Sequence, residues 1–247
     1  MSAATSSPVQ NGQPSGAVWT AVAPYVVPPM AASAAIVPVF RDMIAKSAQQ
    51  KGEPIRKMSL YRGVIEGIKA APTVGVIVGT QMIVQKAVEK ALLGDSGKAS
   101  FSSAIASSAI VGAVSAPVLL VFNGQTMGYS VTESIRRFSF KQCFAIVLQE
   151  TAFVGGLSVA DRLAVVMKKQ FGDNKGVEYA AAFTTGALGS LAGHPANTVV
   201  TRAQSGMKID HIGQLMWGAA RKARAIGCFS VFYKAGKELG LYSVTFK

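Results

Sequence analysis

Charged residues and cysteines are both scarce in this sequence, and each shortage narrows the class of protein. Charged residues make up 15% of the 247 positions, whereas a typical soluble domain carries roughly 25%. The presence of only two cysteines argues against a secreted scaffold held together by disulfides. Hydrophobic residues make up 50% of the chain, which disfavours an intrinsically disordered protein because such chains have low hydrophobicity.

Sequence motifs of catalysis are also missing. The chain contains no P-loop, no GxGxxG after a predicted strand, no HExxH and no paired carboxylates. His194 and His211 stand alone, without a second ligand at a metal-binding spacing. We therefore expect no enzymatic activity, no metal site and no catalytic cofactor.

Acidic residues are fewer than basic ones. The chain has 12 Asp and Glu against 25 Lys and Arg, which gives a net charge of +13. Many of the basic residues gather in three segments, 41–69, 124–141 and 202–224. Aromatic residues are not interleaved among them as a nucleic-acid stacking surface requires, so we expect no nucleic-acid partner. Basic connecting segments in an apolar chain are instead typical of a membrane protein.

The lengths of the uncharged runs predict membrane-spanning helices. Residues 17–40, 99–132 and 179–201 contain no charged side chain, and each run is long enough to cross about 30 Å of hydrocarbon as a helix. Together with the shorter apolar runs, they predict an all-α membrane protein with six transmembrane helices, at 17–46, 64–90, 99–127, 136–162, 178–204 and 215–240. The alternative is an Ala/Gly-rich α/β enzyme, in which 70–85 forms a buried strand and turn.

The chain is predicted to begin with a flexible arm. Residues 1–16 are rich in Ser, Pro, Gln and Gly and carry no charge, and no signal or transit peptide pattern is visible in them. Residues 17–247 then form a single membrane domain. Because basic loops favour the negative compartment, the positive-inside rule places both termini on the opposite side of the membrane.

An internal repeat organises this domain. Pro38, Pro117 and Pro195 stand late in the first, third and fifth predicted helices, 79 and 78 residues apart. A fixed period of this kind indicates tandem structural units. We predict three helix pairs, at 17–98, 99–177 and 178–247.

The residues around the third proline resemble the mitochondrial carrier family. The odd-numbered helices of that family end in Pro-x-Asp/Glu-x-x-Lys/Arg followed by Arg and Gln. The segment GALGSLAGHPANTVVTRAQSG (186–206) is similar to this signature. The matching residues are Pro195, Thr201, Arg202 and Gln204, with Asn197 at the acid position. Tyr61, Arg62 and Gly63 resemble the turn that opens the family's even-numbered helices.

This resemblance implies a pseudo-threefold six-helix bundle around a central cavity. The expected location is the mitochondrial inner membrane, with both termini toward the intermembrane space and membrane lipids as neighbours. Tyr61, Arg62 and Gly63 are candidate lipid-binding residues, which would hold an anionic headgroup through backbone N–H groups and positive charge. Cardiolipin is the bound lipid that the resemblance implies.

The sequence departs from the family at the positions that close the cavity. In carriers, the acids and bases of the three signatures form ion pairs between helices. Here the acid positions hold Phe40, Leu119 and Asn197, and the base positions hold Met43, Phe122 and Val200. None of these residues is charged, and apolar side chains at such positions can pack into a permanent plug. The connections after the odd-numbered helices are also short, so we expect the family's amphipathic surface helices to be truncated.

These departures lead to three functional hypotheses. The first is a carrier-like protein that no longer transports and serves as a structural or accessory subunit of a large inner-membrane complex, either a respiratory complex or ATP synthase. The second is an active, divergent carrier for a small anionic metabolite, with candidate cavity residues Glu150, Lys69, Lys141 and Arg224. An acid in mid-helix within a membrane normally faces a cavity or a partner. The third is a soluble enzyme or scaffold.

Overall fold

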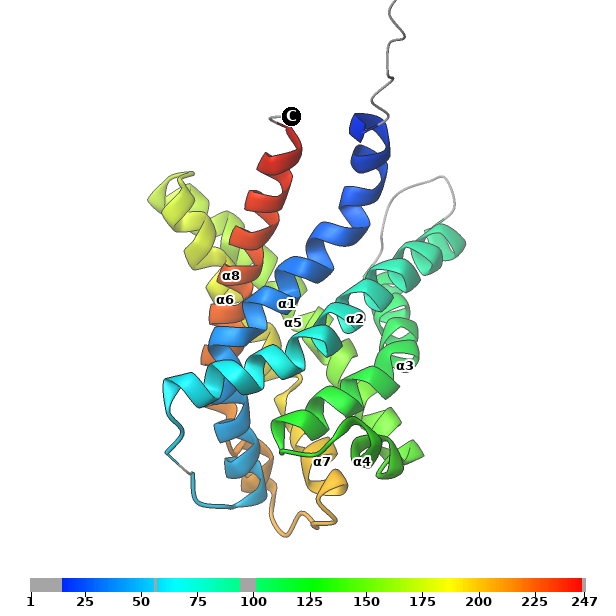
Figure 1. Ribbon diagram of the computed structural model, residues 1–247, viewed down its shortest axis with the longest axis vertical. Coiled ribbons are helices and arrows are strands. Elements are labelled where there is room, and N and C mark those ends of the chain that lie inside the picture. The colour runs from blue at the N-terminus through cyan, green and yellow to red at the C-terminus, as the bar shows by residue number, and fades with distance from the viewer. Residues whose placement is uncertain (1–14, 56, 94–100, 246–247) are drawn as a thin grey trace, which may run out of the picture.

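The computed structural model describes residues 15–55, 57–93 and 101–245, and the regular secondary structure of this part of the chain is entirely helical, without a strand (Figure 1). The long helices are α1 (Ser15–Lys51), α2 (Leu60–Leu93), α3 (Phe101–Thr126), α5 (Phe140–Phe171), α6 (Lys175–Ala192) and α8 (Ala219–Thr245). Shorter elements are α4 (Val131–Arg136), α7 (His194–Gln204) and the 3-10 helix η2 (Ile212–Met216). The predicted α/β alternative is therefore wrong for residues 70–85, which lie inside α2.

Several helix ends follow from local sequence. Ser139 begins α5 with a capping box, in which its side chain accepts a hydrogen bond from the Gln142 N–H while the Gln142 side chain accepts one from the Ser139 N–H. After Gly172, whose φ is 85°, the side chain of Asn174 caps α6 by accepting from the Val177 N–H. The Ser139 cap fixes the turn between α4 and α5, and the Asn174 cap fixes the turn between α5 and α6.

Two predicted helix boundaries are wrong. The helix expected at 136–162 is divided, because α4 ends at Arg136 and the Ser139 cap starts a separate helix that continues to Phe171. The helix expected at 178–204 is also divided, at Gly193 between α6 and α7. Pro195 has no backbone N–H to donate to the preceding turn, which explains a break at this point.

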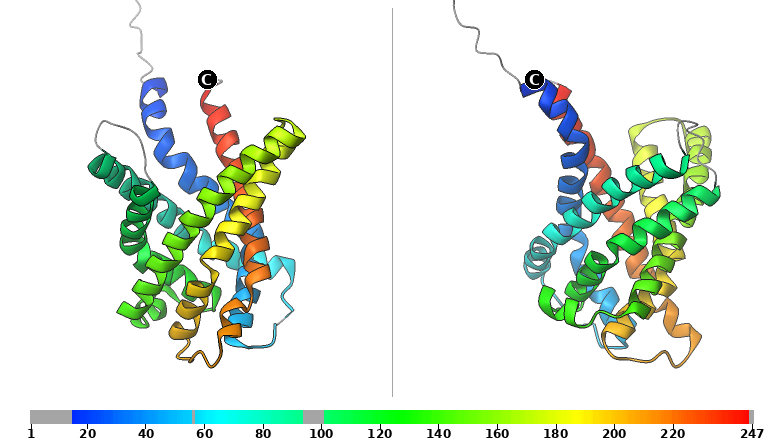
Figure 2. Two further views of the ribbon diagram at one scale, coloured as in Figure 1. Left: turned by 180° about the vertical axis from the view of Figure 1, so that it is seen from behind. Right: turned by 90° about the vertical axis from the view of Figure 1, so that its right-hand side faces the viewer.

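The long helices pack in chain order and close into a ring. Each of α1, α2, α3, α5, α6 and α8 contacts the next, and α8 returns to contact α1. The right-hand view of Figure 2 shows α1 and α8 side by side. Both described chain ends lie at one end of the bundle, and the connections α1–α2, α3–α5 and α7–α8 lie at the other (Figure 1). We call the latter the basic end, because it carries the basic segments 41–69, 124–141 and 202–224.

Within the described residues, three helical stretches are long and apolar enough to cross a membrane: Ala23–Lys51, Leu60–Gln85 and Ile105–Thr126. They indicate a membrane protein. Apolar side chains are also widely exposed on α2, α3 and α5, including Val76, Ile83, Ile110, Val114, Phe144 and Leu148. Exposed apolar surface on this scale is expected where lipid or another protein covers a helix. Of the predicted N-terminal arm, residues 1–14 lie outside the described residues, and α1 begins at Ser15.

The connections at the basic end are short, as expected. The second connection contains the six-residue helix α4, and the third contains the five-residue 3-10 helix η2. In the first connection, no helix is present over the described residues 53–55 and 57–59.

Candidate functional site

A cavity of about 220 Å³ lies inside the ring. Every helix of the ring contributes to its lining, together with α7. The polar lining residues are Lys46, Gln81, Asn123, Thr126, Gln149, Glu150, Ser190, Asn197, Lys222 and Ser230. The volume is below the roughly 300–1,000 Å³ of typical small-molecule pockets.

An apolar layer borders this cavity at Phe40, Leu119, Met43, Phe122 and Val200, which with Asn197 are the six positions that the sequence analysis compared with carrier gate charges. All of these positions except Phe40 line the cavity. Phe40, Met43 and Val200 are 1%, 4% and 1% exposed. The rings of Phe40 and Phe122 lie 6.0 Å apart, and Leu119 packs with Val200. Helices α1, α3 and α7 therefore meet through apolar contacts between side chains from all three predicted repeats.

A polar layer joins the same helices, and Gln50 of α1 is its centre. The Gln50 amide donates to Asn197 Oδ1 at 3.2 Å and to Thr198 Oγ1 at 2.8 Å. Its carbonyl oxygen accepts from Thr201 Oγ1 at 2.8 Å. Lys46 Nζ also donates to Asn197 Oδ1, at 3.0 Å. Asn197 thus receives two hydrogen bonds from α1 without carrying a charge.

The polar layer continues from α3 to its neighbours. Asn123 Nδ2 donates to Gln204 Oε1 at 2.6 Å, and Gln204 Nε2 donates to the Leu120 carbonyl at 2.9 Å. The hydroxyls of Ser47 and Thr126 lie 2.6 Å apart. All of these side chains are buried. Buried polar groups are costly to separate because each would lose its partner away from water.

Arg202 fastens the end of α1 to the third connection. Its guanidinium is buried, donating from Nη1 to the Gln50 carbonyl at 3.1 Å and from Nε to the Lys208 carbonyl at 2.9 Å. It also lies over the Trp217 ring, with 5.8 Å between the guanidinium carbon and the ring centroid. A cation at the C-terminal carbonyls of a helix is favourable. This residue of the predicted signature therefore has a structural position.

The cavity itself holds one acid and two lysines. Glu150 is half-buried and accepts hydrogen bonds from Gln81 Nε2 at 3.3 Å and from Gln149 Nε2 at 3.1 Å. Lys222 is 6% exposed and lines the same cavity. Its ammonium makes no hydrogen bond or ion pair with any residue in the described ranges. The structure thus places the predicted Glu150 at the cavity and adds Lys46 and Lys222, which the sequence analysis did not single out.

The other predicted cavity residues lie elsewhere. Lys69 is exposed and pairs with Glu66 at 2.9 Å, and Arg224 is exposed and pairs with Asp42 at 2.6 Å. Lys141 is exposed on the first turn of α5. None of the three lines the cavity inside the ring. Lys69 and Arg224 instead line a second pocket at the basic end. Pro38 and Pro117 lie on exposed positions inside α1 and α3, while Pro195 is half-buried.

In the predicted lipid-binding turn, side chains are exposed but backbone N–H groups are already hydrogen-bonded. Tyr61 is 77% exposed and Arg62 is exposed. The N–H of Arg62 donates to Ser59 Oγ, however, and the N–H of Gly63 donates to the Ser59 carbonyl. Ser59 thus already accepts a hydrogen bond from each of the two backbone donors that the predicted headgroup site would use. Gly63 instead allows α2 to approach α1, where an added Cβ would lie 3.1 Å from Arg41 Cβ.

Ion pairs at the opposite end tie α5, α6 and α8 together. Lys168 lies 2.9 Å from Asp173 and 3.4 Å from Glu178, and Lys234 lies 3.1 Å from Glu178 and 2.9 Å from Glu238. The hydrogen bond to Asp173, with a further one to Glu178, raises the pKa of Lys168. Exposed ion pairs contribute little individually, so this cluster serves mainly to orient the three helices.

Among the described residues, no group of three or more His, Cys, Asp or Glu side chains is placed to hold a metal ion. Comparison of the chain with protein-family models gave no match, and comparison with curated proteins gave none either.

Proposed function

We propose that this chain is a carrier-like protein of the mitochondrial inner membrane that does not transport and acts as a structural or accessory subunit of a large inner-membrane complex, such as a respiratory complex or ATP synthase. The observation that carries this proposal is the neutral plug at the basic end, where Phe40, Met43 and Val200 are buried and Asn197 holds two α1 side chains. The resemblance to carriers explains the ring and the period of the prolines.

The plug differs physically from a gate. Ion pairs in a wet cavity can break because water solvates both partners. Here, separating α1, α3 and α7 would expose Phe40, Met43 and Val200 and break buried amide and hydroxyl hydrogen bonds. At about 2 kcal/mol for each apolar side chain and about 1 kcal/mol for each hydrogen bond, opening costs roughly 10 kcal/mol. No interaction that would offset this free-energy cost is evident, so α1, α3 and α7 would remain packed together.

The membrane orientation follows from charge. The three basic connections share one end of the ring, and the positive-inside rule directs that end toward the matrix. Both termini then face the intermembrane space. The exposed apolar side chains of α2, α3 and α5 would contact lipid or neighbouring subunits.

The decisive experiment separates mitochondrial membranes, extracted in a mild detergent, on a native gel and identifies the proteins of each band by mass spectrometry. We expect the chain to migrate with a megadalton complex in fixed stoichiometry. Migration only as a free small protein would refute the subunit proposal. Loss of the chain from cells should reduce the stability or assembly of the complex rather than a solute flux.

One observation favours a second function, transport of a small anionic metabolite. The buried Lys222 lines the cavity with Glu150 and Lys46, and it interacts electrostatically with Glu150 without forming a hydrogen bond or a close ion pair with any described residue. Under this alternative, purified protein in liposomes would exchange anions such as dicarboxylates. Exchange would be lost with Lys222→Met and altered with Glu150→Gln. The exposed Lys141→Met is the matched control and should leave exchange unchanged.

A further inference from the structure

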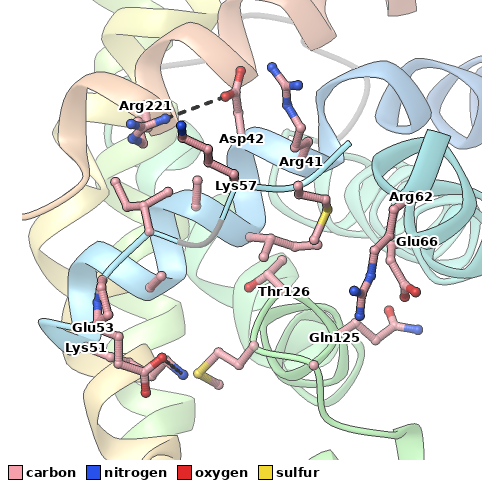
Figure 3. Close-up of a pocket in the computed structure, with 18 of the residues that line it drawn as sticks. Arg41, Asp42, Lys51, Glu53, Lys57, Arg62, Glu66, Gln125, Thr126 and Arg221 are labelled. Atoms are coloured by element: carbon pink, nitrogen blue, oxygen red, sulfur yellow. Dashed lines mark ion pairs between the residues drawn. The ribbon is translucent and has the colours of Figure 1, made fainter. Parts of the chain in front are cut away.

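A second, larger pocket of about 1,220 Å³ lies at the basic end (Figure 3). Its walls are the last turns of α1, the connection at 53–59, the first turns of α2 and α8, and the end of α3. It exceeds the upper range of typical small-molecule pockets, roughly 1,000 Å³. The truncated first connection explains the space, because no helix lies over this part of α1.

The acids of this pocket are already paired. Asp42 lies 2.6 Å from Arg224 and 3.9 Å from Arg221, as shown in part by the dashed line in Figure 3. Glu53 lies 2.7 Å from Lys51, and Glu66 lies 2.9 Å from Lys69. The pocket therefore offers no free carboxylate, and its pairs hold the walls in place.

Three basic side chains of the pocket form no ion pair with any described residue. Arg41 of α1, Lys57 of the connection and Arg62 of α2 all line the pocket. Their side chains make no hydrogen bond, ion pair or ring contact with the described residues. In Figure 3 their charged ends lie at separate places around the pocket rather than converging on one point. The pocket is also lined by the apolar residues Ile44, Ala45, Ala48, Ile55, Met58 and Met127, and by the uncharged polar residues Ser59, Gln125 and Thr126.

We propose that this pocket docks an acidic, partly apolar segment of a neighbouring protein subunit. Cations at separate places around a pocket match several carboxylates along a polypeptide better than they match a single phosphate group. The apolar lining residues provide the desolvated centre that protein interfaces need, and the cations form its charged rim. The inference rests on the proposed function, since it names the chemistry by which the host complex would hold this chain.

A photo-crosslinker provides the direct test. The full-length protein carries p-benzoylphenylalanine at Met58, inside the pocket, and is irradiated in native mitochondrial membranes. The matched control carries it at Phe144, an exposed position on α5. We expect the Met58 position alone to give an adduct with one protein subunit, at a peptide that contains several Asp or Glu residues. An adduct with lipid only, with a peptide lacking acids, or no adduct above the control would overturn the proposal.

Charge reversal provides the second test. The triple variant Arg41→Glu, Lys57→Glu, Arg62→Glu should lower the Met58 adduct at least about tenfold, because three attractions become repulsions. The control reverses three exposed bases outside the pocket, Arg136→Glu, Lys141→Glu and Lys208→Glu, and should leave the yield unchanged. If the charge-reversed protein does not fold, the milder Arg→Gln and Lys→Gln set should still lower the yield, and 0.5 M salt should weaken capture of the wild type.

Different experimental results would refute the subunit proposal and the docking proposal. A wild-type chain that migrates with the complex on native gels but gives no acidic-peptide adduct refutes the docking pocket and leaves the subunit proposal standing. A wild-type chain that migrates alone refutes the subunit proposal and, with it, the docking partner.

Discussion

Replacing Gln50 by alanine isolates the contribution of the polar layer. Gln50 is fully buried and makes three side-chain hydrogen bonds, with Asn197, Thr198 and Thr201. Each bond contributes about 1 kcal/mol to stability, and the vacated space adds a cavity cost of about 1 kcal/mol or more. Since its partners keep other hydrogen bonds, we expect a total loss of roughly 3–4 kcal/mol.

The measurement is thermal unfolding of the purified protein in mild detergent, followed by the fluorescence of its two tryptophans, Trp19 and Trp217. For a chain of this length the loss corresponds to a melting temperature lower by roughly 10 °C. Gln49→Ala is the matched control, because the neighbouring Gln49 has a buried Oε1 without a partner among the described residues, and it should shift the melting temperature little. Equal shifts for the two variants would refute the claim that the polar layer holds α1 to α7.

Three further predictions address packing and charge. Phe40→Ala should destabilise the fold by about 3–5 kcal/mol, because a fully buried aromatic ring leaves a cavity; the same unfolding assay measures it, and a loss below 1 kcal/mol would contradict a packed plug. Gly67→Ala should lower the melting temperature, because its Cβ would lie 2.7 Å from the Val37 carbonyl oxygen, whereas Gly79→Ala, whose nearest contact is 3.6 Å away, should be neutral or stabilising. The raised pKa of Lys168 means that its contribution to stability is complete below the ordinary lysine pKa and is lost as pH rises through the raised value. The melting temperature should therefore fall at strongly alkaline pH, and Lys168→Met should flatten that fall.

The sequence predicted the helices better than it predicted their contacts. Uncharged runs indicated where helices lie, because this signal depends only on residues close in sequence. The break at Gly193 was missed since 179–201 contains no charge, and hydropathy does not register a lost backbone donor. Glu150 was placed at the cavity because an isolated acid in an apolar run is conspicuous.

The remaining site residues depend on contacts between distant segments. Lys46 looked like one more base in the segment 41–69, and only its hydrogen bond to Asn197, 151 positions away, distinguishes it. Lys69 and Arg224 looked similar to it in sequence. They instead pair with Glu66 and Asp42 outside the ring. Which base turns inward is decided by helix rotation and packing, and neither composition nor spacing specifies it.

The spacing of two buried hydrogen bonds has a consequence for how this protein can change during evolution. Ser47 contacts Thr126 across 79 positions, and Thr201 contacts Asn123 across 78, the same intervals that separate the prolines. A substitution at one of these positions removes a hydrogen-bond partner from a residue about a third of the chain length away. A tolerated substitution therefore requires a compensating substitution at that distant partner. Covariation among relatives should accordingly concentrate at offsets near 79 residues, and a deletion within one helix should be harder to accommodate than an insertion in a connection.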